Sequence, residues 1–275
     1  MRSGYPVTMR IARFNHDDVV SYAFVQKDDN DGKDYLVELD GYPLGAQPVS
    51  PTGQRFAADG DGIRLLSPVI PSKVYGLAKN YKDPSAGGSA GDAPVQFPVI
   101  FAKPATSVIG PDDPIVLPAF SRSMNYEPEF AVVIGRIAKN VSAADAMAYV
   151  LGYTCVNDAT LLDIQAEDPT WTRAKGFDTS CPLGPWIETD IDYADAHISF
   201  RLNGKEIPEA EGTTANLVCP IPEQIAEISR FSTLLPGDVI MTGTPYASGT
   251  VKPGDETVVT VEGIGSLRNI IVQGD

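Results

Sequence analysis

The feature that most constrains the fold is a short apolar run, preceded by two glutamates, in residues 126–135, which read YEPEFAVVIG. β-Branched residues dominate the run after Phe130, and this pattern predicts a buried strand. Residues two apart in a strand face the same side, roughly 7 Å from each other, so Glu127 and Glu129 are expected to project together. Two like charges beside an apolar strand are unfavourable unless a cation lies between them or one of them is protonated.

Two interpretations of this pair are open from the residues alone. A bound metal ion would relieve the repulsion between the carboxylates and offset their loss of water. Alternatively, the run is an exposed edge strand with two solvated glutamates. Pro128 fits that alternative, because a residue without an N–H group loses no ladder hydrogen bond at an edge or at the start of a strand.

The amino-terminal part of the chain predicts a small β unit. Alternating patterns predict strands from Met9 to Phe14, from Val19 to Val25 and around residues 35–37, and residues 1–8 are expected to be a lead-in. The Asp-Gly-rich segment 59–62 predicts a turn before a further strand over residues 63–66. We therefore expect a small β annex over residues 1–66.

Prolines interrupt the chain after Ser67 at short intervals, which favours short strands over long helices. Asn203-Gly204 predicts a type I′ hairpin, because both central residues of that turn need positive φ. Two helices are expected, over 142–149 with Ser142 as N-cap and over 222–231 with Pro222 in the first turn. The fold class is predicted to be mostly β with few helices (α+β), and residues 67–275 are expected to form the catalytic β domain. The short apolar runs that predict strands there are 74–77, 99–101, 257–261 and 267–272.

The charge balance excludes several function classes. The chain has 21 Lys and Arg against 36 Asp and Glu, for a formal net charge of −15, so nucleic acid and anionic membranes would be repelled. No apolar run approaches the length of a membrane span, and we expect neither a signal peptide nor a membrane role. Three widely spaced cysteines without a CxxC motif are expected to be reduced thiols of a cytoplasmic protein.

A third acid follows a second apolar strand. Residues 153–157 predict a strand that ends at Asp158, where a carboxylate can meet a cation at the strand's end. Three carboxylates without nearby histidine or a thiolate cluster favour a hard cation, Mg²⁺ first and Mn²⁺ or Ca²⁺ next, over Zn²⁺. Lys175, in the segment 171–179, could stabilise an enolate oxygen opposite the metal. The alternative is an ordinary surface lysine.

Several short motifs after Ser67 are individually weak but together specific. As a set they resemble the fumarylacetoacetate hydrolase family, especially its shorter bacterial members that act on acylpyruvates and oxo-dicarboxylates. The likeness covers roughly three-quarters of the chain and is less specific across the annex. The motifs stand at residues 76–81 (GLAKNY), 101–104 (FAKP), 127–129 (EPE), 152–158 (GYTCVND), 163–165 (DIQ), 175–179 (KGFDT), 181–185 (CPLGP) and 235–245 (LPGDVIMTGTP).

The resemblance implies a β-roll core, a homodimer, and Mg²⁺ or Mn²⁺ held by three acids. By position those acids are the trio reached above from charge and strand geometry. The resemblance places the family's substrate-binding lysine on Lys175, which is the expected catalytic residue, and further substrate contacts on Gln165, Thr244 and Tyr81. The implied metal ligands are Glu127, Glu129 and Asp158.

The implied activity is that of a divalent-metal-dependent enzyme on a small 2-oxo acid, either an acylpyruvate or an oxo-dicarboxylate. The cation would polarise the keto group as a Lewis acid, and the charge pushed onto that oxygen would form an enolate. This electron sink serves C–C bond hydrolysis, decarboxylation and keto-enol or double-bond isomerisation alike. Hydrolysis is the first expectation from the family resemblance.

The sequence departs from the family where a water-activating His/Glu pair is usual, because Pro84 and Gly87 stand at those positions. Loss of a general base lowers rates by about 10²–10⁴-fold, so hydrolysis should suffer most. An isomerase, tautomerase or decarboxylase of the same substrates, or a non-catalytic binder of metal and oxo acid, are therefore alternatives. Leu162 and residues 246–247 are further departures from the family pattern, and residues 85–93 are expected to be a loop.

No imidazole is an obvious replacement for the missing base, because the only histidines are His16 and His197. The candidate replacement bases are Asp83, Asp92 and Glu167.

Overall fold

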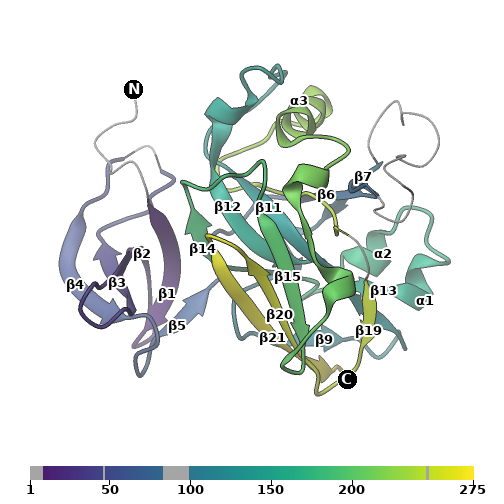
Figure 1. Ribbon diagram of the computed structural model, residues 1–275, viewed down its shortest axis with the longest axis horizontal. Helices are drawn as coiled ribbons and strands as arrows, with labels where there is room; N and C mark the ends of the chain where they lie inside the picture. Colours follow the sequence, from purple (N-terminus) through teal and green to yellow (C-terminus); the bar gives the residue numbers. More distant parts are fainter. Residues whose placement is uncertain (1–8, 46, 83–98, 246–247) are drawn as a thin grey trace.

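The computed structural model describes residues 9–45, 47–82, 99–245 and 248–275, and within these ranges strands greatly outnumber helices (Figure 1). The predicted fold class, mostly β with few helices, is confirmed. The longest described helix has 11 residues, and none of the described helices has the length and apolar character needed to cross a bilayer. The helices are α1 (Leu162–Gln165), α2 (Thr172–Lys175) and α3 (Ile221–Phe231), and the short 3-10 helices are η2 (Ala105–Ser107), η3 (Ala146–Tyr149), η4 (Pro208–Ala210) and η5 (Thr214–Asn216).

Twelve strands form the largest sheet. Its main path has the order β4-β3-β2-β1-β14-β12-β11-β18-β6-β7, with β5 paired to β1 and β8 paired to β14. The strands are β1 (Arg10–His16), β2 (Val19–Lys27), β3 (Asp34–Leu39), β4 (Pro51–Ala57), β5 (Arg64–Leu66), β6 (Val74–Ala78), β7 (Val99–Lys103), β8 (Val108–Ile109), β11 (Pro128–Ile134), β12 (Val150–Asn157), β14 (Cys181–Glu188) and β18 (Val239–Met241).

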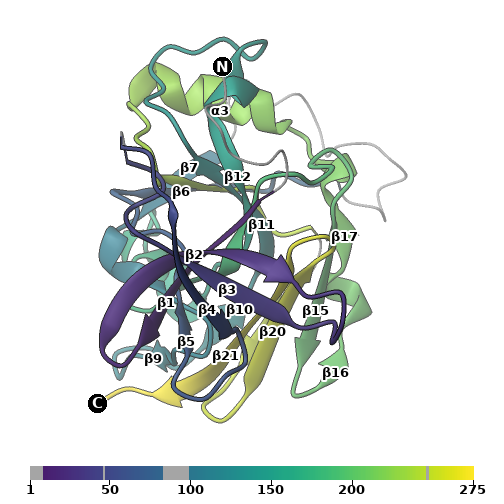
Figure 2. The ribbon, with the colours of Figure 1, turned by 90° about the vertical axis from the view of Figure 1, so that its left-hand side faces the viewer.

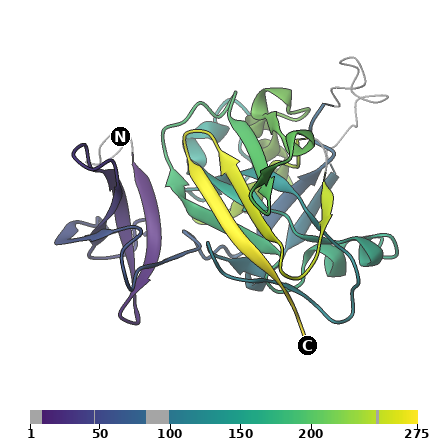
Figure 3. The same ribbon diagram turned by 60° about the horizontal axis from the view of Figure 1, so that its bottom comes forward.

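Two smaller sheets complete the fold. A six-stranded sheet has the order β16-β15-β20-β21-β9 with β17 on β15, and a three-stranded sheet has the order β13-β10-β19. Figures 1 and 3 show β15, β20 and β21 crossing the face of the large sheet formed by β11, β12 and β14. The strands are β9 (Ile115–Leu117), β10 (Met124–Tyr126), β13 (Thr160–Leu161), β15 (His197–Leu202), β16 (Lys205–Glu206), β17 (Gly212–Thr213), β19 (Gly249–Val251), β20 (Glu256–Val261) and β21 (Gly265–Gln273).

The main core lies between these two layers. Phe130 and Tyr153 of the large sheet and Phe200 and Val259 of the six-stranded sheet belong to one cluster of buried hydrophobic residues. All seven residues of β11 are buried, because this strand pairs with β12 on one side and with β18 on the other. The alternative of an exposed edge strand with solvated glutamates is therefore wrong.

The amino-terminal strands β1 to β5 form the smaller unit, which lies to one side of the core (Figures 1 and 2). Strands β1 to β4 are a meander of neighbouring antiparallel pairs, and Phe14 and Leu36 are fully buried in its core. Its strands are continuous with the rest of the large sheet through two residue pairs, Arg10↔Glu188 and Ile11↔Ile187, between β1 and β14. The sequence did not predict β4, since most of this edge strand is exposed and lacks an apolar alternation. The division between residues 66 and 67 stays a prediction.

Local predictions elsewhere had mixed outcomes. The Asn203-Gly204 hairpin is confirmed, with φ of 52° and 75° between β15 and β16. The later helix is α3, which begins one residue before the predicted start. The helix predicted over 142–149 is wrong, because only the 3-10 helix η3 forms there. The Tyr149 carbonyl accepts the Gly135 N–H at 2.7 Å, which draws the chain into pairing with β11 instead of a further helical turn.

The cysteines are packing residues. Cys155 and Cys181 are fully buried, Cys219 is partly exposed, and none of them forms a disulfide within the described residues. Burial raises the pKa of the Cys155 and Cys181 thiols to about 12, so both are protonated at neutral pH. The expectation of reduced thiols agrees with these positions.

Candidate active site

Strand register brings the three predicted acids together. In the β11–β12 pair, Pro128 lies opposite Asn157, so Glu127 just before β11 meets Asp158 just after β12. Two further hydrogen bonds hold the two residues together at this end of the strand pair. The Asp158 N–H donates to the Glu127 carbonyl at 2.9 Å, and the Glu127 N–H donates to Asn157 Oδ1 at 2.9 Å. The juxtaposition is therefore a property of the backbone, not of flexible side chains.

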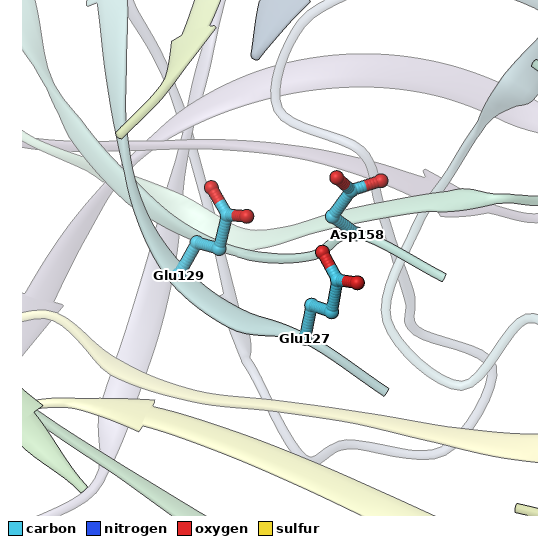
Figure 4. A group of neighbouring side chains, drawn as sticks. All are labelled: Glu127, Glu129 and Asp158. Atoms are coloured by element: carbon cyan, nitrogen blue, oxygen red, sulfur yellow. The ribbon is translucent and has the colours of Figure 1, made fainter. Parts of the chain in front are cut away.

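The carboxylates of Glu127, Glu129 and Asp158 converge on one point (Figure 4). One oxygen from each residue lies within 4.8 Å of the other two. Glu129 is 2% exposed and Asp158 is fully buried, whereas the Glu127 side chain retains 16% exposure. Three ionised acids that are this close together and this deeply buried are unfavourable unless positive charge compensates them.

Lys175 provides part of that charge. Its Nζ donates to Asp158 Oδ2 at 2.6 Å, to Thr160 Oγ1 at 2.8 Å and to Glu127 Oε2 at 3.0 Å. An ammonium group has three protons, so these three acceptors use all of them. Burial acts to lower the pKa of Lys175, but Asp158 and Glu127 raise it overall, and the group stays charged. Lys175 is 3% exposed, which excludes the alternative of an ordinary surface lysine.

A second buried lysine was not predicted from the sequence. Lys103, at the end of β7, has a fully buried side chain, and its Nζ lies 2.7 Å from Asp158 Oδ1. It also donates to the carbonyls of Lys175 at 2.5 Å and Ser180 at 2.9 Å. The signal that could have found it is the alternation of β7, in which Lys103 shares the inward face with Phe101.

The two lysines shift the pKa values of the three acids in different directions. Burial acts to raise the pKa of Asp158, but Lys103 and Lys175 outweigh it, so this carboxylate titrates below its usual range. For Glu129, burial and the charges of Asp158 and Glu127 raise the pKa well above its ordinary value. Burial also raises the pKa of Glu127, although Lys175 opposes the shift. Asp158 is thus a fixed anion, and Glu129 is the acid that most lacks a counter-charge.

The loop after β18 anchors Glu129. The Gly243 N–H donates to Glu129 Oε2 at 2.7 Å, and Thr244 Oγ1 lies 3.4 Å from Glu129 Oε1. Gly243 has φ of 99°, and a Cβ at this position would lie 2.8 Å from the Leu77 carbonyl oxygen. Only glycine allows this close approach without strain.

The acids open into a cavity of about 510 Å³. Gln165, Thr244 and Lys175, three of the predicted site residues, line it together with the three acids, and most of the remaining wall is apolar. A cavity of about 560 Å³ elsewhere, near Phe120, has a single carboxyl group in its lining, so the chemistry favours the cavity at the acids. The apolar part of the wall consists of Leu77, Ala78, Phe101, Leu162, Ala166 and Trp171.

The donor set fits a divalent cation. The three acids offer oxygen ligands only, as Mg²⁺ and Mn²⁺ prefer. If all are ionised, three carboxylates and two ammonium groups leave one uncompensated negative charge in a buried place. Asp158 Oδ1 accepts no hydrogen bond from the described residues, although Lys103 Nζ lies beside it in an ion pair. These residues could therefore hold a divalent ion.

The other predicted site residues do not all reach the cavity. Tyr81 is absent from its lining, and its hydroxyl lies 3.1 Å from Thr242 Oγ1 instead. Glu167 is exposed and also lies outside the lining. His16 packs on Phe56 with ring centroids 4.6 Å apart, and His197 lies on the outer face of β15, so neither is near the acids.

Some sequence predictions fall on residues that the structure does not describe. These are the lead-in expected over 1–8, the candidate bases Asp83 and Asp92, the departures Pro84, Gly87 and 246–247, and the loop expected over 85–93. Among the described residues that line the cavity there is no histidine, and the only carboxyl groups are the three clustered acids.

Comparison with protein families divides the chain into two matched segments. Residues 73–272 match the model described as fumarylacetoacetate (FAA) hydrolase C-terminal. Residues 9–68 match the model described as Rv2993c-like, N-terminal. The first segment contains every residue of the candidate site.

Three individual proteins illustrate the similarity. Protein Rv2993c of Mycobacterium tuberculosis is 42% identical over 270 residues, which cover 96% of this chain and 98% of that protein. Human mitochondrial oxaloacetate tautomerase FAHD2A is 39% identical over 224 residues, covering 76% of this chain and 70% of that protein. The crystal structure of 2-hydroxyhepta-2,4-diene-1,7-dioate isomerase from Mycobacterium marinum superposes with a TM-score of 0.85 at 40% identity, covering 96% of this chain and 98% of that chain.

Proposed function

The chain belongs to the fumarylacetoacetate hydrolase family, and from that premise we propose that it is a divalent-cation-dependent tautomerase or isomerase of a small 2-oxo acid. The observation that carries the proposal is the cluster of Glu127, Glu129 and Asp158 around the Lys175 ammonium, in a cavity whose described lining has no further carboxyl group and no histidine. Similar proteins named as a tautomerase and as an isomerase support the same choice.

The cation that we propose is Mg²⁺, with Mn²⁺ as the next candidate, held by the three acids. When bound, it would supply a Lewis acid that withdraws electrons from the 2-keto group. Among the ions that accept all-oxygen ligand sets, Mg²⁺ also keeps several waters, so the site would have room for the oxygens of a 2-oxo acid.

Lys175 is proposed to stabilise negative charge on the keto oxygen. When solvent water takes a proton from the carbon next to the keto group, electrons move onto the keto oxygen, and an enol forms once that oxygen takes a proton back from water. A buried ammonium group stabilises the intermediate charge more strongly than water would. In the present arrangement all three Lys175 protons are used by protein acceptors, so contact with substrate requires that one of these hydrogen bonds is exchanged.

Gln165 and Thr244 are proposed to orient the substrate. Both line the cavity and carry groups that can donate hydrogen bonds to a carboxylate. Thr244 lies next to Gly243, whose N–H holds Glu129, so the same loop would position a cation ligand and the substrate. Tyr81, in contrast, would act through Thr242 rather than by direct contact.

Hydrolysis of a C–C bond, the first expectation from the sequence, has weaker support. It needs an activated water, and the described part of the cavity offers no histidine and no carboxylate besides the acids assigned to the cation. Tautomerisation and double-bond isomerisation move a proton, which solvent water can take and return, and they need no water as a nucleophile. The geometry therefore favours the alternative over the first expectation.

The test uses the purified chain with Mg²⁺ and substrates whose products differ. With oxaloacetate, we expect faster loss of the enol absorbance in the ultraviolet without release of CO₂. With acetylpyruvate, we expect tautomerisation without formation of free pyruvate. Pyruvate release from acetylpyruvate would instead support a hydrolase, CO₂ release from oxaloacetate a decarboxylase, and no turnover despite cation binding a non-catalytic binder.

A homodimer, on family resemblance, and a cytoplasmic location, on the three widely spaced cysteines, remain part of the proposal. Light scattering of the purified chain at several concentrations would test the oligomeric state. A mass that corresponds to one chain at every concentration would contradict it.

A further inference from the structure

We propose that Lys79 binds the second carboxylate of a dicarboxylic 2-oxo acid, and so selects dicarboxylates over monocarboxylates. This inference rests on the proposed function, since it assumes that the first carboxylate and the keto oxygen lie at the acid cluster. It goes further by assigning a substrate class and a specificity-determining residue.

The position of Lys79 carries the first part of the inference. Lys79 directly follows β6 and lines the same cavity as the three acids. Its φ is 57°, a left-handed conformation that is unfavourable for a residue with a side chain. Such conformations persist only where surrounding contacts hold the backbone in place, and they are concentrated at binding and active sites.

Asn80 supplies those contacts. It is 3% exposed, its Nδ2 donates to the Thr242 carbonyl at 2.9 Å, and its Oδ1 accepts the Cys219 N–H at 2.9 Å. The backbone next to Lys79 is thereby tied to the strand that leads into Gly243 and Thr244. The Lys79 Cα is therefore held at a fixed position relative to Glu129.

Charge carries the second part. Only two of the described residues that line the cavity are cationic, Lys79 and Lys175. Lys175 is fully engaged by Asp158, Thr160 and Glu127, whereas Lys79 forms no hydrogen bond or ion pair with any residue that the structure describes. A second anionic group on a substrate would therefore find one available counter-charge in this lining.

The remaining wall explains why that counter-charge matters. The side chains of Phe101 and Leu162 have no hydrogen-bond donor for a carboxylate, and that of Trp171 has only its indole N–H. A carboxylate placed against such a wall would lose its hydrating water without gaining a hydrogen bond or a counter-charge. An uncharged tail of the same length would need no cation, so Lys79 should distinguish the two.

Calorimetric titration of the Mg²⁺-loaded protein with three probes tests the inference. 2-Oxoglutarate and 2-oxopentanoate have the same number of carbons, and they differ at the far end by a carboxylate against a methyl group. Oxalate carries only the portion that faces the acid cluster. We expect 2-oxoglutarate to bind more tightly than 2-oxopentanoate, and Lys79→Met to weaken 2-oxoglutarate about ten- to a hundredfold, as the loss of a charged hydrogen bond does.

Three comparisons complete the experiment. Affinity for 2-oxopentanoate and for oxalate should change little in Lys79→Met, and Lys79→Arg should recover most of the affinity for 2-oxoglutarate. Lys82→Met is the matched control, because Lys82 is a nearby exposed lysine outside the cavity lining, and it should bind all three probes as the unmodified protein does. Melting temperatures would show that each variant is folded.

The outcomes separate this inference from the proposed function. Equal weakening of 2-oxoglutarate and 2-oxopentanoate in Lys79→Met, or no weakening of either, would overturn the role of Lys79 whatever the enzyme catalyses. Selective loss of 2-oxoglutarate affinity in a protein without tautomerase or isomerase activity would overturn the proposed function and leave the dicarboxylate site in place.

Discussion

Lys175 Nζ donates a 2.6 Å hydrogen bond to Asp158 Oδ2, so the lysine proposed to contact substrate is held by one of the proposed cation ligands. The same ammonium also bonds Glu127, the most exposed of the three acids. A cation that takes oxygen atoms from Asp158 and Glu127 would weaken both bonds. Cation binding is thus expected to prepare Lys175 for substrate.

Replacing Lys175 with Met should abolish turnover while cation binding persists. The variant removes the group proposed to stabilise the enolate oxygen and leaves all three carboxylates in place. Enol-keto exchange of oxaloacetate measures the activity, and calorimetry with Mg²⁺ measures the binding. Lys139→Met, at an exposed lysine that bonds the Arg230 carbonyl, is the control. Full activity in Lys175→Met would deny that residue its proposed role.

Glu129→Gln should remove the stabilisation that Mg²⁺ gives to the folded protein. A cation at 100 times its Kd raises the free energy of unfolding by about 2.7 kcal/mol, and the variant should lose most of this gain. Differential scanning fluorimetry with and without Mg²⁺ is the measurement. Glu188→Gln is a matched control, because Glu188 is also buried but lies away from the cluster, in β14. An unchanged Mg²⁺ response in Glu129→Gln would remove Glu129 from the ligand set.

The cation-free protein should become less stable as pH rises, in part because of Glu129. Burial and the neighbouring charges of Asp158 and Glu127 raise its pKa well above 4.5, so above that pH the folded state binds more protons than the unfolded state. Stability then falls with increasing pH through this window. Melting temperatures from about pH 5 to about pH 8 should fall less steeply in Glu129→Gln than in the unmodified protein.

The same pKa shift predicts that Mg²⁺ binding releases protons. Calorimetry in buffers of different ionisation enthalpy would measure the number released, which should be smaller in Glu129→Gln. Equal release by both proteins would show that another group carries the proton.

Gly243→Ala should weaken Mg²⁺ binding more than the same substitution at a glycine of similar φ away from the site. A Cβ at residue 243 would lie 2.8 Å from the Leu77 carbonyl oxygen, and relief of that clash would move the N–H that holds Glu129. Gly254→Ala is the matched control, since Gly254 has a similar φ of 94° and open space around its Cβ position. Mg²⁺ affinity should fall in Gly243→Ala and not in Gly254→Ala. Equal affinities would contradict the anchoring role of Gly243.

Lys103→Met should destabilise the fold by about 3–5 kcal/mol. It removes one of the two ammonium groups that compensate the buried Asp158 carboxylate, together with two hydrogen bonds to buried carbonyls. Urea unfolding measures this. Lys73→Met, at the Lys73–Asp238 pair, is the comparison. Asp238 keeps hydrogen bonds from Ser72 and Leu235 there, so a smaller loss is expected. A loss in Lys103→Met no larger than that in Lys73→Met would contradict a special role for Lys103.

Much of the site was predictable because its geometry is local to two strands. The apolar run after Phe130 predicts β11, and the period of two then places Glu127 and Glu129 on one side. Asp158 was predictable as the end of β12. The sequence could not decide between a buried and an edge strand, because the partners β12 and β18 lie far along the chain.

Long-range contacts account for the rest. Lys103 was missed because its acceptors belong to residues 158–180, and a lysine at the end of a strand is usually solvated. The helix over 142–149 had suitable residues, but pairing of Gly135 with Tyr149 overrode their propensity. Strand β4 was invisible because an exposed edge strand needs no apolar face.

The placement of the acids at one end of the antiparallel pair β11–β12, in the interior of the large sheet, has a consequence for how the protein loses function on heating. Hydrogen bonds in such strands open only when the entire molecule unfolds, whereas peripheral segments open locally and often. Amide protons of Phe130 to Val133 should therefore exchange among the slowest in the chain. Because these strands hold the acids together, activity should be lost on heating only at the temperature at which the whole protein melts.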